Sequence, residues 1–257
     1  MPTISTTIIT KNEADNIAPC IESVVWTDEI IILDCGSTDN TKQICEKYAP
    51  KLKFYETDWP GYGEQKNRAL KLATSDWILS IDADERVTSA LKNEILQALE
   101  HDAEKYTAYQ MPRQNYFLNK PLKHCCGKGE ASSPRLAKKG YCEFSNDIVH
   151  EKTIITGNIG KLQSELSHFP WKNLEDLLNK TNIYSTLGAL NLKQRKKKSS
   201  FAMALIRAKW AFIRTYFLRL GFLDGWPGFI IALNAFEETF YKYAKLSEEI
   251  INRNRRL

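Results

Sequence analysis

Several features that would place a protein quickly in a class are missing from these 257 residues. The start, M-P-T-I-S-T-T-I-I-T, has no basic segment and only a short apolar run, so we expect no signal peptide. The charge-free window late in the chain, Gly225–Phe236, is shorter than the roughly 20 apolar residues that cross a bilayer. A formal charge of +5 is a mild excess, so we expect no nucleic acid partner.

The six cysteines give no metal or disulfide pattern. Cys125 and Cys126 are adjacent rather than in a C-x-x-C pair, which argues against a zinc site with His124 and Cys142. Because no secretory context accompanies them, we interpret the cysteines as reduced thiols of a cytoplasmic protein. A Gly-rich basic phosphate loop near the first predicted strand is also missing, which disfavours nucleotidyl transfer.

The first hundred residues instead alternate between strand and helix patterns. Runs of β-branched and apolar residues predict strands at 4–10, 29–34, 53–57 and 77–82. Helical periodicity and capping residues predict helices at 17–24, from Ser37 or Thr38 to about 48, 64–73 and 88–99. This alternation is typical of an α/β fold in which helices flank a mostly parallel sheet.

The chain becomes less regular after residue 105 and then turns helical. Strands are expected at 106–115, 135–137 and 148–155, and a polar loop at 119–133. A helix is predicted at 173–192, followed by a basic run at 193–198. We therefore predict one domain over residues 1–165 and a helical region over residues 166–257.

Residues 201–243 are rich in aromatic and aliphatic side chains and predict two amphipathic helices around a G-W-P-G turn. Wide aromatic faces beside basic residues fit a helix that lies on an anionic membrane surface. Packing of the same aromatics onto the first domain explains the pattern equally well. Both interpretations stay open.

Polar side chains follow three of the predicted strands at the point where each strand ends. They are Thr10, Asn12 and Glu13; Asp34, Ser37 and Asp39; and Asp82, Asp84 and Arg86. Each set alone also fits a helix cap or a solvated turn. Because the carboxyl ends of parallel strands meet at one edge, where α/β proteins bind ligands, their joint placement predicts a single crevice.

The residue types in this crevice suit a nucleotide diphosphate. Asp82 and Asp84 point the same way on an extended backbone, and a carboxylate pair suits Mg²⁺ or Mn²⁺ shared with phosphates. Asp34 can accept hydrogen bonds from a ribose or a pyrimidine. Lys66, in G-Y-G-E-Q-K-N-R-A, can approach sugar or phosphate, or it is an ordinary solvated helix lysine.

A diphosphate-linked sugar is also a leaving group, and its transfer to a hydroxyl requires a base. Glu151 is the candidate base, with Asp147 as the alternative. His150, next to Glu151, could ligate the metal or bind the acceptor. Each of these three residues could equally be an ordinary loop residue.

The motifs at these positions resemble family 2 glycosyltransferases of the GT-A fold. The matching segments are T-I-I-T-K-N-E (7–13), I-I-L-D-C-G-S-T-D-N-T (31–41), G-Y-G-E-Q-K-N-R-A (61–69) and I-D-A-D-E-R (81–86). Three further segments are similar to the subgroup of lipopolysaccharide core β-1,4-glucosyltransferases, which use UDP-glucose: P-R-L (134–136), V-H-E (149–151) and F-L-D-G-W-P-G-F (222–229).

The resemblance implies an inverting, metal-dependent transfer from a UDP-sugar, with glucose the favoured sugar. It places Asp34 at the uridine, Asp82 and Asp84 at the diphosphate and metal, and Glu151 toward the acceptor. The E-D-x-x-x-R pattern that carries the base in many members is missing, since Glu175-Asp176 lacks that context.

The expected acceptor is a lipid-linked glycan such as the lipopolysaccharide inner core, at the inner face of the bacterial inner membrane. A sugar transferase acting on polyprenyl phosphate, or a membrane protein that binds nucleotide sugar without turnover, are the alternatives.

Overall fold

The computed structural model describes residues 1–126, 133–145 and 152–254, with side chains described up to residue 248. The chain forms two compact units, one of residues 1–114 and 129–168 and the other of residues 115–128 and 169–257. Residues 115–128 group with the helical unit. The sequence-based boundary after residue 165 had placed them in the first domain. Phe117, Leu122 and Cys125 are buried in one cluster with Leu177 and Ile230, which explains this grouping.

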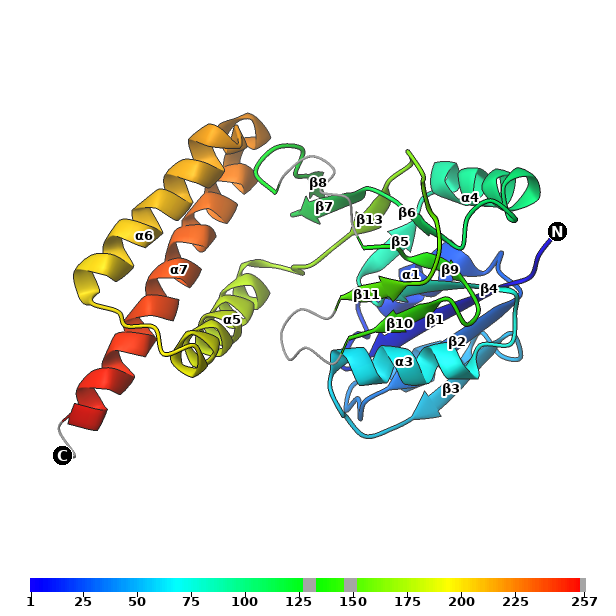
Figure 1. Cartoon of the computed structure of the whole chain (residues 1–257), viewed down its shortest axis with the longest axis horizontal. Helices are drawn as coiled ribbons and strands as arrows, with labels where there is room; N and C mark the ends of the chain where they lie inside the picture. Colours follow the sequence, from blue (N-terminus) through cyan, green and yellow to red (C-terminus); the bar gives the residue numbers. More distant parts are fainter. Residues whose placement is uncertain (127–132, 146–151, 255–257) are drawn as a thin grey trace. The chain divides into compact units, whose positions relative to one another are not determined.

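The first unit is built on a seven-stranded sheet in the order β12-β6-β9-β4-β1-β2-β3 (Figure 1). Its parallel core consists of β1 (Ile4–Thr10), β2 (Glu29–Asp34), β3 (Leu52–Glu56) and β4 (Trp77–Asp82). Antiparallel β9 (Leu136–Lys138) lies between β4 and β6 (Ala108–Gln110), and β12 (Ile159–Lys161) pairs with β6 in parallel. The predicted mostly parallel α/β sheet is therefore confirmed.

Helices connect the parallel strands: α1 (Ile17–Val24), α2 (Thr41–Glu46), α3 (Tyr62–Leu72) and α4 (Ser89–His101). The Thr88 hydroxyl caps α4 by accepting a hydrogen bond from the Leu91 amide at 3.1 Å. Ser37 and Thr38 do not cap α2, which begins at Thr41, because Ser37 is bonded to the loop before it.

The shorter strands differ more from the prediction. The expected strand at 106–115 is two strands, β6 and β7 (Arg113–Phe117), since Pro112 between them has no amide hydrogen for a ladder. β7 pairs with β8 (Lys120–Pro121), β5 (Glu85–Val87) with β13 (Leu166–His168), and β10 (Cys142–Phe144) with β11 (Thr153–Ile155), all antiparallel.

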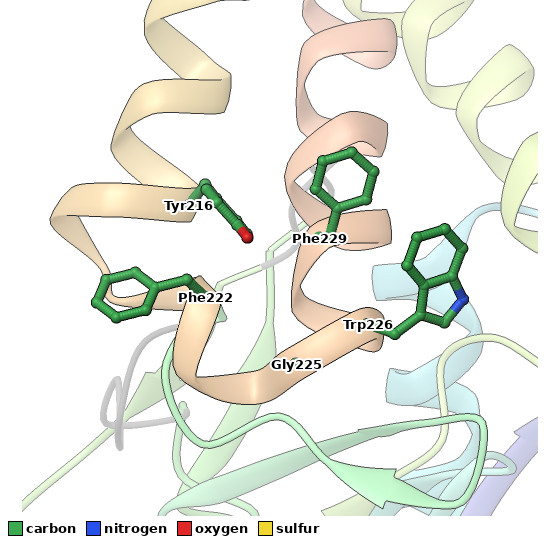
Figure 2. Close-up of a pocket in the computed structure, with 5 residues that line it drawn as sticks. All are labelled: Tyr216, Phe222, Gly225, Trp226 and Phe229. Carbon is green, nitrogen blue, oxygen red and sulfur yellow. The ribbon is translucent and has the colours of Figure 1, made fainter.

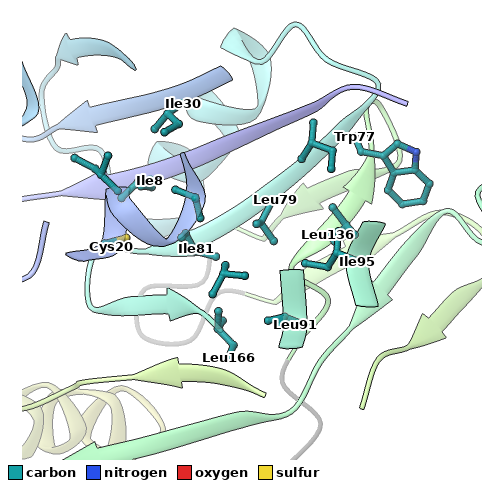
Figure 3. Close-up of a cluster of buried hydrophobic side chains, with 14 of the residues drawn as sticks. Ile8, Cys20, Ile30, Trp77, Leu79, Ile81, Leu91, Ile95, Leu136 and Leu166 are labelled. Carbon is teal, nitrogen blue, oxygen red and sulfur yellow. The ribbon is translucent and has the colours of Figure 1, made fainter. Parts of the chain in front are cut away.

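The main core lies between the sheet and helices α1 and α4 (Figure 3). Ile8, Leu79 and Ile81 from the central strands are at most 1% exposed, and Leu91 and Ile95 of α4 are completely buried. Each such aliphatic side chain contributes roughly 1.5 to 3 kcal/mol by its removal from water. This core fixes the register of β1, β2 and β4, and with it the positions of the polar residues at their ends.

The second unit contains α5 (Leu174–Gln194), α6 (Phe201–Ile213) and α7 (Gly225–Asn254). A π-helical turn (Arg214–Leu218) and a 3₁₀ turn (Gly221–Asp224) join α6 to α7, which packs beside it (Figure 1). The G-W-P-G segment, predicted as the turn, is the first turn of α7, where proline is tolerated because its missing amide hydrogen is not needed. Among the described residues no helix is both long and apolar enough to cross a membrane.

Candidate active site

Three strand ends meet at one edge of the sheet. The pairing of β1 with β2 sets Thr10 opposite Asp34, and the pairing of β1 with β4 sets Ile9 opposite Asp82. The loops that follow these strands therefore start side by side, as the sequence predicts for parallel strands.

Asp34 organises the loop after β2. Its carboxylate accepts hydrogen bonds from the amides of Gly36 (2.9 Å) and Ser37 (2.7 Å) and from the Ser37 hydroxyl. Asn12 links this loop to the one after β1, because its amide donates to the Ser37 hydroxyl at 2.8 Å and its side-chain oxygen accepts from the Thr38 amide at 2.8 Å. Asp34, Asn12 and Ser37 thus lock two of the three loops together.

Glu13 and Asp39 complete the same link. The Glu13 carboxylate accepts from the Asn16 side chain at 2.8 Å, and Asp39 accepts from the amides of Ala14 (3.1 Å) and Thr41 (3.0 Å). The Thr10 hydroxyl, by contrast, is buried and has no hydrogen-bond partner among the described residues. Because buried polar groups are nearly always paired, the Thr10 hydroxyl is a candidate to bond to a ligand.

Asp82 lies between two buried cations. Its Oδ1 is 3.0 Å from Lys66 Nζ, and its Oδ2 is 2.8 Å from Arg135 Nη2. Burial alone would raise the pKa of Asp82, but the charges of Lys66 and Arg135 outweigh it and hold that pKa well below its usual range. Lys66 is only 5% exposed and lies over the Phe144 ring, so the alternative of a solvated helix lysine is wrong.

Arg135 also binds Glu85, which the sequence-based site did not include. Glu85 is completely buried, its Oε1 lies 2.8 Å from Arg135 Nη2, and its Oε2 accepts from the Asp82 amide at 3.0 Å. Burial raises the pKa of Glu85, and Arg135 opposes that rise. Both residues occur in segments that matched the family, I-D-A-D-E-R and P-R-L, but they are 50 residues apart and no spacing rule links them.

Asp84 meets a second residue that the sequence did not single out. Asp84 Oδ2 lies 3.4 Å from His168 Nε2, and the two side chains are 21% and 13% exposed. The antiparallel pairing of β13 with β5, which sets His168 opposite Glu85, brings them together. Arg86, the next residue on β5, is opposite Ser167, and burial lowers the pKa of its guanidinium.

A carboxylate oxygen and an imidazole nitrogen this close can share a divalent cation. Within the described parts of the chain no three His, Cys, Asp or Glu side chains gather for a metal. Asp84 and His168 could hold such a cation together with water or a bound ligand. Both Asp82 oxygens face cations instead. Asp147, His150 and Glu151 lie outside the described residues.

Comparison with known proteins shows the family to which the chain belongs. The family described as Glycosyl transferase family 2 matches residues 5–135, a range that contains Thr10, Asp34, Asp82 and Arg135. The chain belongs to glycosyltransferase family 2. The resemblance that the motifs indicated is confirmed, and with it a GT-A-like α/β fold followed by a helical C-terminal region.

Relatives of this family 2 glycosyltransferase match nearly its full length. An uncharacterized glycosyltransferase of Rickettsia prowazekii is 34% identical, over 96% of this chain and 88% of its own. The lipopolysaccharide core biosynthesis glycosyltransferase LpsC of Rhizobium meliloti is 30% identical, over 95% of this chain and 91% of its own. A fragment of S. aureus TarS, residues 1–349, solved in complex with UDP-GlcNAc, has the same fold, with a TM-score of 0.50 at 16% identity over 97% of this chain and 92% of the fragment.

Proposed function

We propose that this glycosyltransferase moves a sugar, with glucose favoured, from a UDP-sugar to a lipid-linked bacterial glycan such as the lipopolysaccharide inner core. The transfer inverts the anomeric carbon. The observation that carries the proposal is the convergence of Thr10, Asp34, Asp82 and Asp84 at one sheet edge. The relative LpsC, whose name assigns it to lipopolysaccharide core biosynthesis, supports the acceptor class.

The nucleoside end of the donor is assigned to the two locked loops. The buried Thr10 hydroxyl can bond to the base or ribose, and Asp34, next to it across the strands, holds the loop that closes over the nucleoside. Asn12, Glu13, Ser37 and Asp39 shape this pocket through the hydrogen bonds within it. Because most of their polar groups are already engaged, these four residues position the donor more than they bind it.

The diphosphate end is assigned to Asp84, His168 and the cation pair around Asp82. Mg²⁺ or Mn²⁺ held by Asp84 and His168 would stabilise the negative charge of the leaving UDP. Asp82 holds Lys66 and Arg135 in place beside the proposed diphosphate position. His150 stays a further proposed ligand.

Glu151 is our proposed base, with Asp147 as the alternative. A positioned carboxylate that accepts the proton of the acceptor hydroxyl contributes a factor of roughly 10² to 10⁴. Glu151→Gln should therefore lower transfer by about that factor while leaving UDP binding unchanged. If Asp147→Asn alone lowers transfer by this factor, the catalytic base is Asp147.

The proposal is tested by supplying a panel of UDP-sugars with and without Mn²⁺ and measuring release of UDP by slow hydrolysis, which needs no acceptor. We expect one UDP-sugar to be hydrolysed faster, and only with metal. Asp84→Asn should abolish that reaction. Asp76→Asn is the matched control, because Asp76 lies just before the opposite end of β4 and bonds to Thr3. Equal hydrolysis of every sugar in Asp84→Asn and wild type would refute the proposal.

A further inference from the structure

A half-exposed apolar stripe runs along α6 and its π-helical continuation. Its members are spaced three, four, three and four residues apart, so they share one face of the helix. They are Met203, Ile206, Trp210, Ile213 and Phe217, and each is between 38% and 68% exposed. Ala204, Ala208 and Ala211 form the buried face of α6, which packs beside α7 (Figure 1).

The segment that carries this stripe has charge of one sign. Residues 177–223 contain no Asp or Glu but hold ten Lys and Arg. Arg207, Lys209 and Arg214 belong to α6 or its continuation and are exposed beside the stripe. The side chain of Asp224, the first acid after this segment, is only 3% exposed, and its carboxylate accepts hydrogen bonds from the amides of Lys123, His124 and Cys125.

The turn after α6 extends the apolar surface. Tyr216, Phe222, Trp226 and Phe229 surround a hollow of about 340 Å³ at this turn (Figure 2). Phe222 and Trp226 are 45% and 66% exposed, and the Trp226 and Phe229 rings stack with centroids 5.6 Å apart. Aromatic side chains that are half exposed in this way are favoured at the boundary between lipid headgroups and acyl chains.

We propose that α6 lies flat on the surface of an anionic phospholipid bilayer. The stripe from Met203 to Phe217 faces the acyl chains, and Lys209 and Arg214 reach the phosphate groups. A second copy of this chain is a poorer occupant, because it would set one acid-free, basic segment against another. The inference rests on the proposed function only in explaining why the enzyme would bind a membrane, which is to reach a lipid-linked acceptor. Binding of α6 to the bilayer itself needs neither donor nor acceptor.

Co-sedimentation of the full chain with vesicles tests the inference. The vesicles are phosphatidylcholine with and without phosphatidylglycerol. Each basic residue near an anionic surface contributes on the order of 1 kcal/mol, so wild type should bind the anionic vesicles at least about tenfold more tightly. Ile206→Glu with Trp210→Glu should weaken that binding at least about tenfold, because a charge replaces each apolar anchor.

Two controls make the result specific. Leu178→Glu with Ile183→Glu changes residues of α5 that are 54% and 55% exposed, and this variant should bind like wild type. Lys209→Glu with Arg214→Glu keeps the stripe and should lose only the preference for phosphatidylglycerol. Helical circular dichroism checks that each variant is folded.

Equal binding to both kinds of vesicle, or unchanged binding of the Ile206 and Trp210 variant, would overturn the inference. A dimer that forms without lipid and is lost in that variant would overturn it too, since a second copy would then cover the stripe. Hydrolysis of UDP-sugar without lipid should be normal in the α6 variants, so failure of this inference and failure of the proposed function give different results.

Discussion

Replacement of Arg135 by methionine should destabilise the first unit by about 3 to 5 kcal/mol near neutral pH, the range for breaking a buried ion pair from one side. Arg135 is 7% exposed, and its Nη2 lies 2.8 Å from both Asp82 Oδ2 and Glu85 Oε1. Without it, Asp82 keeps Lys66, but completely buried Glu85 keeps the Asp82 amide at 3.0 Å and a longer ion pair with Arg113, whose Nη1 is 3.7 Å away. Most of the destabilisation should therefore come from the buried charge of Glu85.

The loss of stability in Arg135→Met should be smaller at low pH than at high pH. Burial raises the pKa of Glu85, and Arg135 is the main influence that limits the rise. A carboxyl group whose folded pKa lies above its unfolded value stabilises the protein below the unfolded pKa, and this contribution is lost as pH rises through the folded pKa. Arg135→Met should thus be less destabilising near about pH 5, where Glu85 can be protonated, than near about pH 8.

Urea unfolding followed by tryptophan fluorescence measures both effects. Arg68→Met is the matched control, because Arg68 Nη1 lies 2.5 Å from Asp58 Oδ1 but Asp58 is 76% exposed. An exposed pair of this kind is worth about 1 kcal/mol or less. Adding Glu85→Gln to Arg135→Met should recover part of the stability. Equal losses in Arg68→Met and Arg135→Met, with no recovery in the double variant, would refute the reasoning.

Two further predictions concern stability. Asp224→Ala removes the acceptor of three backbone amides and of the His124 ring, so the free energy of unfolding should fall by more than about 2 kcal/mol in thermal unfolding. A loss of stability as small as that of Asp58→Ala, which breaks an exposed ion pair, would contradict this prediction. Burial raises the pKa of Glu29, but hydrogen bonds from Lys53, Ser5 and Thr74 outweigh it and lower the pKa to about 2. Such a carboxylate stabilises the protein above its unfolded pKa, and this contribution is lost as pH falls through about 2, so Glu29→Gln should cost up to about 3 kcal/mol at neutral pH and almost nothing near pH 2. A deficit in urea unfolding that does not change with pH would contradict this.

The parallel core of the sheet could be predicted because its strands are continuous runs of β-branched and aliphatic residues, as in Glu29–Asp34, where every residue is buried. Parallel strands have their carboxyl ends at one edge, so the placement of Thr10, Asp34 and Asp82 at that edge followed from the predicted parallel strands alone. This part of the site could be predicted without knowing any side-chain contacts.

The partners of Asp82 and Asp84 could not be predicted in the same way. Arg135 reaches Asp82 because it directly precedes antiparallel β9, and His168 reaches Asp84 because β13 pairs with β5; neither pairing has a local sequence signal. Lys66 was ambiguous because α3 turns polar residues, Gln65, Lys66 and Asn67, toward the protein interior. Hydrophobic periodicity has no means of detecting a buried face of this kind.

Titration of UDP with and without Mn²⁺ into wild type and Asp84→Asn tests the central claim most directly, since it asks whether the strand-end site holds a metal-bridged diphosphate. We predict that Mn²⁺ strengthens UDP binding to wild type at least about tenfold and that Asp84→Asn loses this gain while its metal-free affinity is unchanged. The same strengthening by Mn²⁺ in both proteins would contradict the account.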